Sequence, residues 1–135
     1  MADDLTDHQY GELLAFRSAL RGFLAWSEAE AKTHGLAPSH HQLLLAIRGW
    51  ACDEAPTIGD VASELRLRHH SAVELVDRAE QRGLVVRQHD PVDRRVVRLR
   101  LTREGRSKLQ ALSIAHIEEL RRLSRSLPDL AALGG

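Results

Sequence analysis

The chain has 135 residues, of which 43% are hydrophobic and 28% charged, and its formal net charge is zero. This length suits one domain with a hydrophobic core, and neither a transmembrane-length apolar run nor a signal peptide is visible, which predicts a soluble cytoplasmic protein without a membrane partner. Cys52 is the single cysteine and excludes an intrachain disulfide.

The balanced charge conceals one strongly basic segment. Residues 66–108 carry twelve Lys or Arg and six Asp or Glu, whereas residues 1–65 carry four basic and ten acidic side chains. Concentrated positive charge is the electrostatic signature of a nucleic-acid-binding surface. The alternative interpretation is a solvated basic surface without such a partner.

A long helical pattern runs from about residue 7 to residue 33. Apolar side chains form one broad face of this helix: Tyr10, Leu13, Phe16, Leu20, Phe23 and Leu24. Ala15, Ala19 and Trp26 lie on the far side. A helix that is apolar on two sides is usually packed between two partners. We therefore expect one side to contact its own domain and the other a second subunit.

Two shorter helices follow the break at residues 34–38. Ser39 and Gln42 fit a capping box, which predicts that Ser39 caps a largely buried second helix. After a loop at residues 51–56, Thr57 is a suitable N-cap for a third helix.

Residues 69–101 have the pattern of a helix followed by a β-hairpin. Ala72, Leu75, Val76 and Ala79 recur every three or four residues, which places them on one helical face, and Gly83 ends the helix. Alternation in residues 95–101, after the turn signal at residues 90–93, predicts a hairpin with a basic tip. Two helices and this hairpin make a winged helix-turn-helix.

Thr102 is the expected N-cap of a last helix, which runs to about residue 125 and is followed by a helical turn at residues 129–133. Its leucines form a narrow stripe with His116 in the middle. The first and last helices present more apolar surface than one small domain can bury, which predicts a homodimer.

The expected fold is mainly α with a small β-hairpin wing. One domain spans residues 1–135, with a winged helix-turn-helix lobe at residues 39–101 and dimerisation helices at residues 7–33 and 102–133.

Six short motifs with fixed spacing carry a family resemblance: Val61-Ala62-Ser63-Glu64-Leu65, Val76-Asp77-Arg78, Arg82-Gly83-Leu84-Val85, Asp90-Pro91, Asp93-Arg94-Arg95 and Leu101-Thr102-Arg103-Glu104-Gly105. Over residues 57–108 the chain resembles the MarR family of bacterial transcription regulators. The resemblance implies a winged-helix homodimer that binds double-stranded DNA at a pseudo-palindromic operator, usually as a repressor. It also implies release of DNA when a small aromatic or phenolic ligand binds, or when a cysteine is oxidised.

The resemblance assigns the DNA-binding residues. Arg95 matches the arginine of the wing that enters the minor groove, with Arg94 beside it and Asp93 orienting it through a charge-assisted hydrogen bond. The groove-facing helix offers further candidates: Arg66, Arg68, His69, His70, Ser71 and Glu74. Arg87, Arg98 and Arg100 are expected to contact phosphates or to form salt bridges in the wing.

The residues before this helix depart from the family pattern. Arg66 and Arg68 stand where glycine and a serine or threonine cap are common, so the operator sequence cannot be taken from relatives.

An effector pocket is expected between the dimerisation helices and the lobe. Its candidate lining residues combine aromatic walls with polar anchors, as an aromatic acid requires: Arg17, Trp26, His40, His41, Trp50 and His116. Ordinary core and interface roles are the alternative for each of them.

The eight histidines raise the question of a metal site, with His34, His40, His41 and His116 as possible ligands near Glu28 or Glu30. A paired H-x-x-x-H face and a C-x-x-C motif are both lacking, so no metal or other cofactor is expected.

Asp53 and Glu54 follow Cys52 and disfavour its reactive thiolate. A zinc- or redox-responsive regulator, or a protein-binding winged helix without a DNA target, remains an alternative. Enzymatic motifs such as G-x-S-x-G are absent, so no catalysis is expected.

Overall fold

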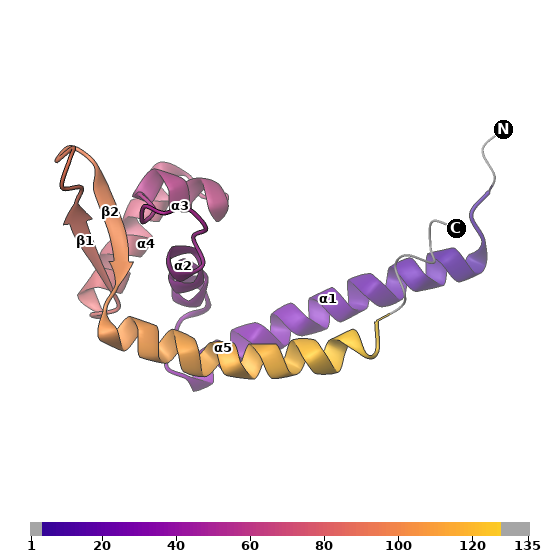
Figure 1. Cartoon of the computed structure of the whole chain (residues 1–135). Helices are drawn as coiled ribbons and strands as arrows, with labels where there is room; N and C mark the ends of the chain where they lie inside the picture. Colours follow the sequence, from indigo (N-terminus) through magenta and orange to yellow (C-terminus); the bar gives the residue numbers. More distant parts are fainter. Residues whose placement is uncertain (1–3, 128–135) are drawn as a thin grey trace.

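The computed structural model describes residues 4–127 as five helices and a two-stranded antiparallel sheet. The elements follow the chain in this order: α1 (Asp7–Thr33), α2 (Pro38–Arg48), α3 (Ile58–Glu64), α4 (His69–Gln81), β1 (Val85–His89), β2 (Val97–Leu101) and α5 (Arg103–Ser124). Figure 1 shows a lobe made of α2, α3, α4 and the hairpin, and an arm in which α1 and α5 lie side by side. The mainly helical winged helix-turn-helix predicted from the sequence is confirmed.

Threonine side chains cap three of the helices, α1, α3 and α5, and the caps of α3 and α5 were predicted. Thr57 Oγ1 accepts a hydrogen bond from the Asp60 N–H at 3.1 Å, and the Asp60 carboxylate accepts one from the Thr57 N–H at 2.9 Å. Thr102 Oγ1 accepts from the Gly105 N–H at 3.0 Å at the start of α5. Each contact satisfies an amide that has no partner within the helix.

The start of α2 differs from the prediction. Ala37 is the N-cap, no side chain caps the helix, and Pro38 is its first residue. The capping box predicted for Ser39 is therefore wrong. Proline suits a first helical position, because its fixed φ is already helical and its missing N–H would have no partner there. The helix thus begins before Ser39 can act as a cap.

The hydrophobic core lies in the lobe and at its contact with α5. Leu43 and Leu44 from α2 belong to one buried cluster with side chains from the rest of the lobe, including Val76 of α4 and Leu99 of β2. The predicted inner face of α4 is confirmed, because Ala72, Leu75, Val76 and Ala79 are all buried. Leu112 extends this core into α5.

The hairpin is fixed in register and tied to the lobe. Val85 pairs with Leu101 at its base, and His89 pairs with Val97 near its tip. The outer edge of β2 is also occupied, since the Leu99 N–H donates to the Pro56 carbonyl at 2.8 Å and Thr57 forms a bridge with Arg98. The wing is thereby held against the start of α3.

The end of α4 and the start of α5 meet in a close junction, formed by Gly83, Leu84, Thr102 and Gly105. The Thr102 N–H donates to the Leu84 carbonyl at 3.0 Å, and its hydroxyl donates to the Gly83 carbonyl at 2.6 Å. A Cβ at Gly105 would lie only 2.2 Å from the Leu84 carbonyl oxygen. Glycine is therefore required for α5 to approach the lobe this closely.

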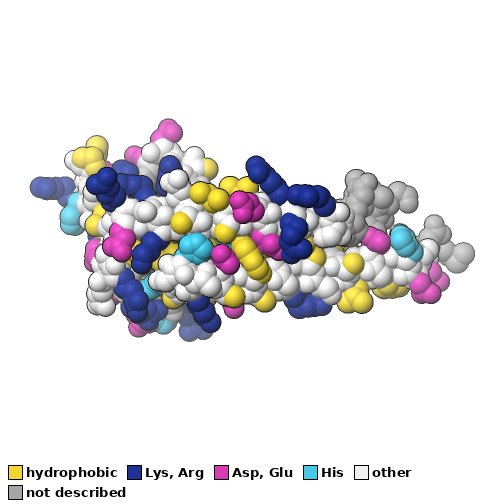
Figure 2. All heavy atoms as spheres, turned by 90° about the horizontal axis from the view of Figure 1, so that it is seen from below, with side chains coloured by type: hydrophobic (Ala, Val, Ile, Leu, Met, Phe, Trp, Pro, Cys, Tyr) yellow, Lys and Arg dark blue, Asp and Glu magenta, His cyan; other side chains and the backbone are white. Residues whose placement is uncertain are grey.

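The arm has little buried surface of its own. Only Ala31 is buried among the 27 residues of α1. Large apolar side chains stay exposed on both helices of the arm, as the hydrophobic patches along it in Figure 2 illustrate. They are Tyr10, Leu13, Leu14, Leu20 and Leu24 on α1, and Ile114, Ile117 and Leu120 on α5.

The helical turn predicted at residues 129–133 lies outside the described residues. Among the helices of residues 4–127, none has both the length and the apolarity needed to cross a membrane.

The junction predicts a strong effect of Gly105→Ala. The added methyl meets backbone that cannot move without shifting the base of the hairpin, so the free energy of unfolding should fall by about 1–3 kcal/mol. Gly59→Ala in α3 is the matched control, because its Cβ would meet only Thr57 Oγ1 at an ordinary 3.7 Å. Urea unfolding followed by circular dichroism measures both variants; equal stability of the two would contradict this account of the junction.

Candidate nucleic-acid interface

Helix α4 has an exposed face opposite its buried one. His69, His70 and Glu74 are exposed and Ser71 is partly exposed, while the core residues of α4 point into the lobe. Arg66 and Arg68 are exposed just before the helix. The structure therefore brings the groove-facing candidates together on one side of the helix-turn-helix, with positive charge at the start of α4.

The first turn of α4 is unusual, because no side chain caps it. Arg68 is the N-cap residue and makes no side-chain hydrogen bond to the helix. Arg66 precedes it in a left-handed conformation, with φ of 56°, which is uncommon for a residue other than glycine. The resulting tight turn is closed by the Leu67 N–H, which donates to the Ala62 carbonyl at 2.8 Å.

The tip of the wing is organised by Asp90. One carboxylate oxygen accepts hydrogen bonds from the Val92 and Asp93 N–H groups at 2.8 and 3.0 Å, and the other accepts from Arg98 Nε at 2.7 Å. The Asp93 N–H, the Arg98 guanidinium and the Val92 N–H together lower the pKa of Asp90 to about 2. The predicted turn signal is thus also a compact ionic cluster.

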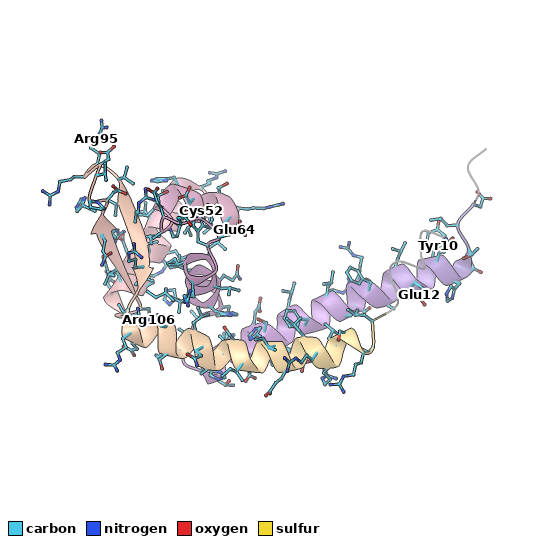
Figure 3. All side chains as sticks on the ribbon, in the orientation of Figure 1. Tyr10, Glu12, Cys52, Glu64, Arg95 and Arg106 are labelled. Atoms are coloured by element: carbon cyan, nitrogen blue, oxygen red, sulfur yellow. The ribbon has the colours of Figure 1, made fainter. Side chains whose placement is uncertain are left out.

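Arg95 projects from this tip, as Figure 3 shows. Its side chain is 91% exposed, yet its Nε and a terminal nitrogen each donate to Asp93 at 3.1 Å. This fork lowers the pKa of the Asp93 carboxyl, with a further contribution from the Arg95 N–H. The charge-assisted contact expected between Asp93 and Arg95 is therefore present in the structure, and Arg94 is exposed beside it.

Two other arginines of the wing are engaged within the protein. Arg87 donates to Asp77 and Glu80 of α4 at 2.5 and 2.6 Å, which joins β1 to that helix. Arg98 donates to Asp90, to the Ala55 carbonyl at 2.7 Å and to Glu54 at 2.8 Å. The sequence left two roles open for these side chains, phosphate contacts and salt bridges within the wing. The structure shows them in salt bridges.

A separate cavity of about 730 Å³ lies where α1, α2 and α5 meet. Its apolar wall includes Phe23, Leu45 and Leu120, and its polar groups include His41 and His116. This volume is typical of small-molecule sites.

His116 is the centre of the polar groups in this cavity. Its Nδ1–H donates to the Leu112 carbonyl at 2.8 Å, so in the neutral ring Nε2 accepts from the Ser27 hydroxyl at 2.6 Å. The His41 and Trp26 rings each lie 4.8 Å from the His116 ring. Burial, and secondarily His116, lower the pKa of His41.

The predicted pocket residues fall in several places. His41 and His116 line the cavity and Trp26 packs against His116. Trp50 instead lines two hollows near Cys52, and Arg17 is exposed on α1 and lines neither these hollows nor the cavity.

His40 is buried near the lobe core, where burial and then Arg82 and Arg78 lower its pKa. Sequence reasoning missed Ser27, Gln42 and Ser113, although Ser113 lies three residues before His116 on the same helical face.

Metal ligands are not clustered in the described part of the chain. Within residues 4–127, no three His, Cys, Asp or Glu side chains are arranged to hold an ion. Cys52 is exposed in the loop before α3.

Part of the sequence is similar to known transcription regulators. Residues 34–96 match a model of the MarR family. The uncharacterized HTH-type transcriptional regulator YsmB of Bacillus subtilis is 37% identical over 73 residues, which are 54% of this chain and 50% of YsmB. The matched part thus spans about half the length of this curated relative.

Solved structures match over nearly the whole chain. CouR from Rhodococcus jostii RHA1, solved with p-coumaroyl-CoA, is 26% identical with a TM-score of 0.73, covering 94% of this chain and 88% of CouR. A mutant of MepR from Staphylococcus aureus, solved with an oligodeoxyribonucleotide, is 19% identical with a TM-score of 0.68, covering 96% of this chain and 88% of MepR. The protein is thus a winged helix-turn-helix protein with a helical arm. Its sequence resembles the MarR family over residues 34–96, and its fold is that of the matching solved structures.

The Asp90 cluster predicts a specific pH dependence for Asp90→Asn. Because the pKa of Asp90 is lowered from 3.8 to about 2 in the folded protein, its carboxylate stabilises the fold above the unfolded value, and this contribution is lost as pH falls from 3.8 towards 2. The variant should be less stable than wild type at pH 7, with the difference vanishing near pH 2. Urea unfolding of both proteins between pH 7 and pH 2 measures this difference in stability, with the exposed Glu74→Gln as control. A difference that does not change with pH would contradict the stabilising role of the Asp90 carboxylate.

Proposed function

We propose that this protein is a homodimeric transcription regulator that binds double-stranded DNA through α4 and the wing. The observation that supports this most is the placement of Arg95, which is exposed at the wing tip but held by Asp93. An oriented arginine at the end of a hairpin suits the minor groove, where it responds to groove width and potential. The exposed face of α4 suits the adjacent major groove.

The arm supplies the proposed dimer interface. Burying one large apolar side chain stabilises an assembly by roughly 1.5–3 kcal/mol, and the arm exposes eight of them. A two-fold pair of arms would present two α4 helices to one side of a duplex. Dimeric helix-turn-helix proteins bind pseudo-palindromic sites whose two halves are about 34 Å apart, which is one turn of the DNA double helix.

The regulatory part of the proposal is that a small aromatic or phenolic ligand releases a repressor from its operator. The cavity between α1, α2 and α5 supports this, because it touches both helices of the arm and the first helix of the lobe. A ligand there would favour one orientation of the lobe relative to the arm. Since both half-sites must fit together, a small change of orientation lowers the affinity for DNA. The protein would act by binding and not by catalysis.

Arg95→Ala should weaken binding to the DNA upstream of the protein's own gene by about 1–3 kcal/mol and reduce the salt dependence by about one phosphate contact. Fluorescence anisotropy over a series of salt concentrations measures both quantities. Val92→Ala is the control, because Val92 is 94% exposed on the same tip and carries no charge.

Asp93→Asn then separates orientation from charge. If Asp93 acts by orienting Arg95, its loss weakens binding although the protein becomes more positive. Tighter binding by Asp93→Asn would show that only net charge matters at the tip. Unchanged affinity of Arg95→Ala would overturn the role of the wing, and no salt-dependent DNA binding by wild type would favour a protein-binding winged helix.

Ile114→Glu tests the dimer. Ile114 is 53% exposed on α5 and does not line the cavity, so a charge there should be tolerated by the monomer but not by an apolar interface. We expect a shift from dimer to monomer in analytical ultracentrifugation, with loss of cooperative operator binding. Glu118→Gln, an exposed neighbour on α5, is the control. A variant that remains dimeric would place the interface elsewhere.

A further inference from the structure

A second hollow adjoins the effector cavity along α5. It has a volume of about 570 Å³, and three arginines line it, Arg48 from α2 and Arg103 and Arg106 from α5. Ser107, Gln110 and Ser113 supply hydroxyl and amide groups, and none of the described residues that line this hollow is Asp or Glu. It is therefore a concave surface with three positive charges and no lining carboxylate.

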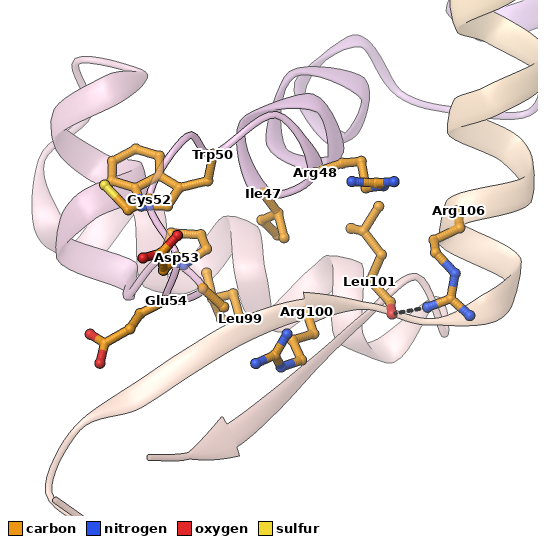
Figure 4. Close-up of a pocket in the computed structure, with 12 residues that line it drawn as sticks. Ile47, Arg48, Trp50, Cys52, Asp53, Glu54, Leu99, Arg100, Leu101 and Arg106 are labelled. Atoms are coloured by element: carbon orange, nitrogen blue, oxygen red, sulfur yellow. Dashed lines mark hydrogen bonds between the residues drawn. The ribbon is translucent and has the colours of Figure 1, made fainter. Parts of the chain in front are cut away.

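These arginines are largely free to bind an anion. Within residues 4–127, Arg48, Arg103 and Arg106 form no ion pair, and Arg106 donates one hydrogen bond, to the Leu101 carbonyl at 3.1 Å. Figure 4 shows the Arg48 side chain extending from α2 toward α5, and Arg106 on α5 turned to the Leu101 carbonyl. Guanidinium groups bind phosphate oxygens through paired hydrogen bonds, and three of them suit a multiply charged anion better than a single carboxylate.

The basic hollow and the effector cavity form one bipartite groove. Ser113 lines both of them. On α5, the basic residues Arg103 and Arg106 and the cavity residues Ser113, Ile117 and Leu120 recur every three, four or seven residues, which places them along one face. Arg106 and Ile117 are eleven residues apart, so the groove extends for about 16 Å along the helix.

The two ends of this groove differ in charge. Glu28 is one of the residues that line the apolar cavity and disfavours an anionic group there, whereas the three arginines favour one at the other end. The hollow drawn in Figure 4 shares Arg48 and Arg106 but also contains Asp53 and Glu54, which would repel an anion. The α5 side is therefore the better place for negative charge.

We propose that the effector is a soluble amphiphile with an apolar ring or acyl group at one end and phosphate groups at the other. The apolar end occupies the cavity near His116, and the phosphates contact Arg48, Arg103 and Arg106. This inference rests on the proposed function, because it specifies the ligand of that regulator. The phosphate end is distinct from the DNA interface, since Arg106 lies at the base of the wing and Arg95 at its tip, as Figure 3 shows.

The test compares two probes that share one apolar group, 4-phenylbutyl diphosphate and 4-phenylbutanol. Calorimetric titration of the full chain should give an affinity for the diphosphate that is about 10-fold or more higher. Trp26, which packs against His116, reports occupation of the apolar end by its fluorescence. Inorganic diphosphate alone should bind more weakly than the ester. Equal affinities of the ester and the alcohol would show that the phosphates are not bound by the arginines. Equal affinities of the ester and inorganic diphosphate would show that the apolar group is not bound in the cavity.

Arg48→Gln combined with Arg103→Gln should remove most of the advantage of the diphosphate and leave binding of the alcohol unchanged. Arg106 is retained because of its contact with Leu101. Arg121→Gln, an exposed arginine of α5 outside the groove, is the matched control. Circular dichroism verifies that each variant is folded.

The remaining outcomes separate this inference from the proposed function. Diphosphate binding that is unaffected in the double variant overturns the assignment of the arginines. A second outcome would also overturn that assignment. If the double variant binds the operator more weakly and with less salt dependence, but binds the diphosphate as wild type does, these arginines contact DNA. Failure of both probes to bind, with wild-type operator binding intact, would reject the ligand class but leave the DNA-binding regulator standing.

Discussion

The contact of the Leu84 carbonyl with Thr102 and Gly105 is the constraint on which the arrangement of lobe and arm depends. This oxygen accepts the Thr102 N–H and occupies the space that a side chain at residue 105 would fill. The base of the hairpin and the first turn of α5 are thereby fixed to each other. The cavity lies along α5, and the wing is the hairpin whose base is fixed at this junction. The junction therefore sets the positions of both the cavity and the candidate DNA-binding surface.

Charge is distributed between structure and binding in a consistent way. Arg87 and Arg98 neutralise carboxylates of the lobe and hold the wing in place. Arg95 is held by one carboxylate but remains exposed. Arg103, in the same basic segment, has no acidic partner in the described residues, so the arginines of this segment differ in how far the protein itself engages them. The zero net charge of the whole chain does not reveal which arginines are paired within the protein and which remain exposed.

Much of the fold was predictable from local sequence. The spacing in α4, the turn at Asp90 and the caps Thr57 and Thr102 depend on neighbouring residues, which a sequence displays directly. The exposed position of Arg95 at the wing tip and its contact with Asp93 were predictable from the motif. The lining of the cavity was not, because Ser27 and His116 are 89 residues apart and meet only when α1 and α5 pack. Similarly, the pairing of Arg98 with Glu54 and the loop before α3 joins segments 44 residues apart.

The ties of Arg98 to Asp90 and to the Ala55 carbonyl also have a mechanical consequence. They stiffen the hairpin and the helix-turn-helix into one lever, whose fulcrum is the junction with α5. In a lever, displacement grows with distance from the fulcrum, and Arg95 lies at the far end of the hairpin. A rotation too small to disturb the packing around Leu112 would therefore be magnified at Arg95, the side chain that we propose enters the minor groove.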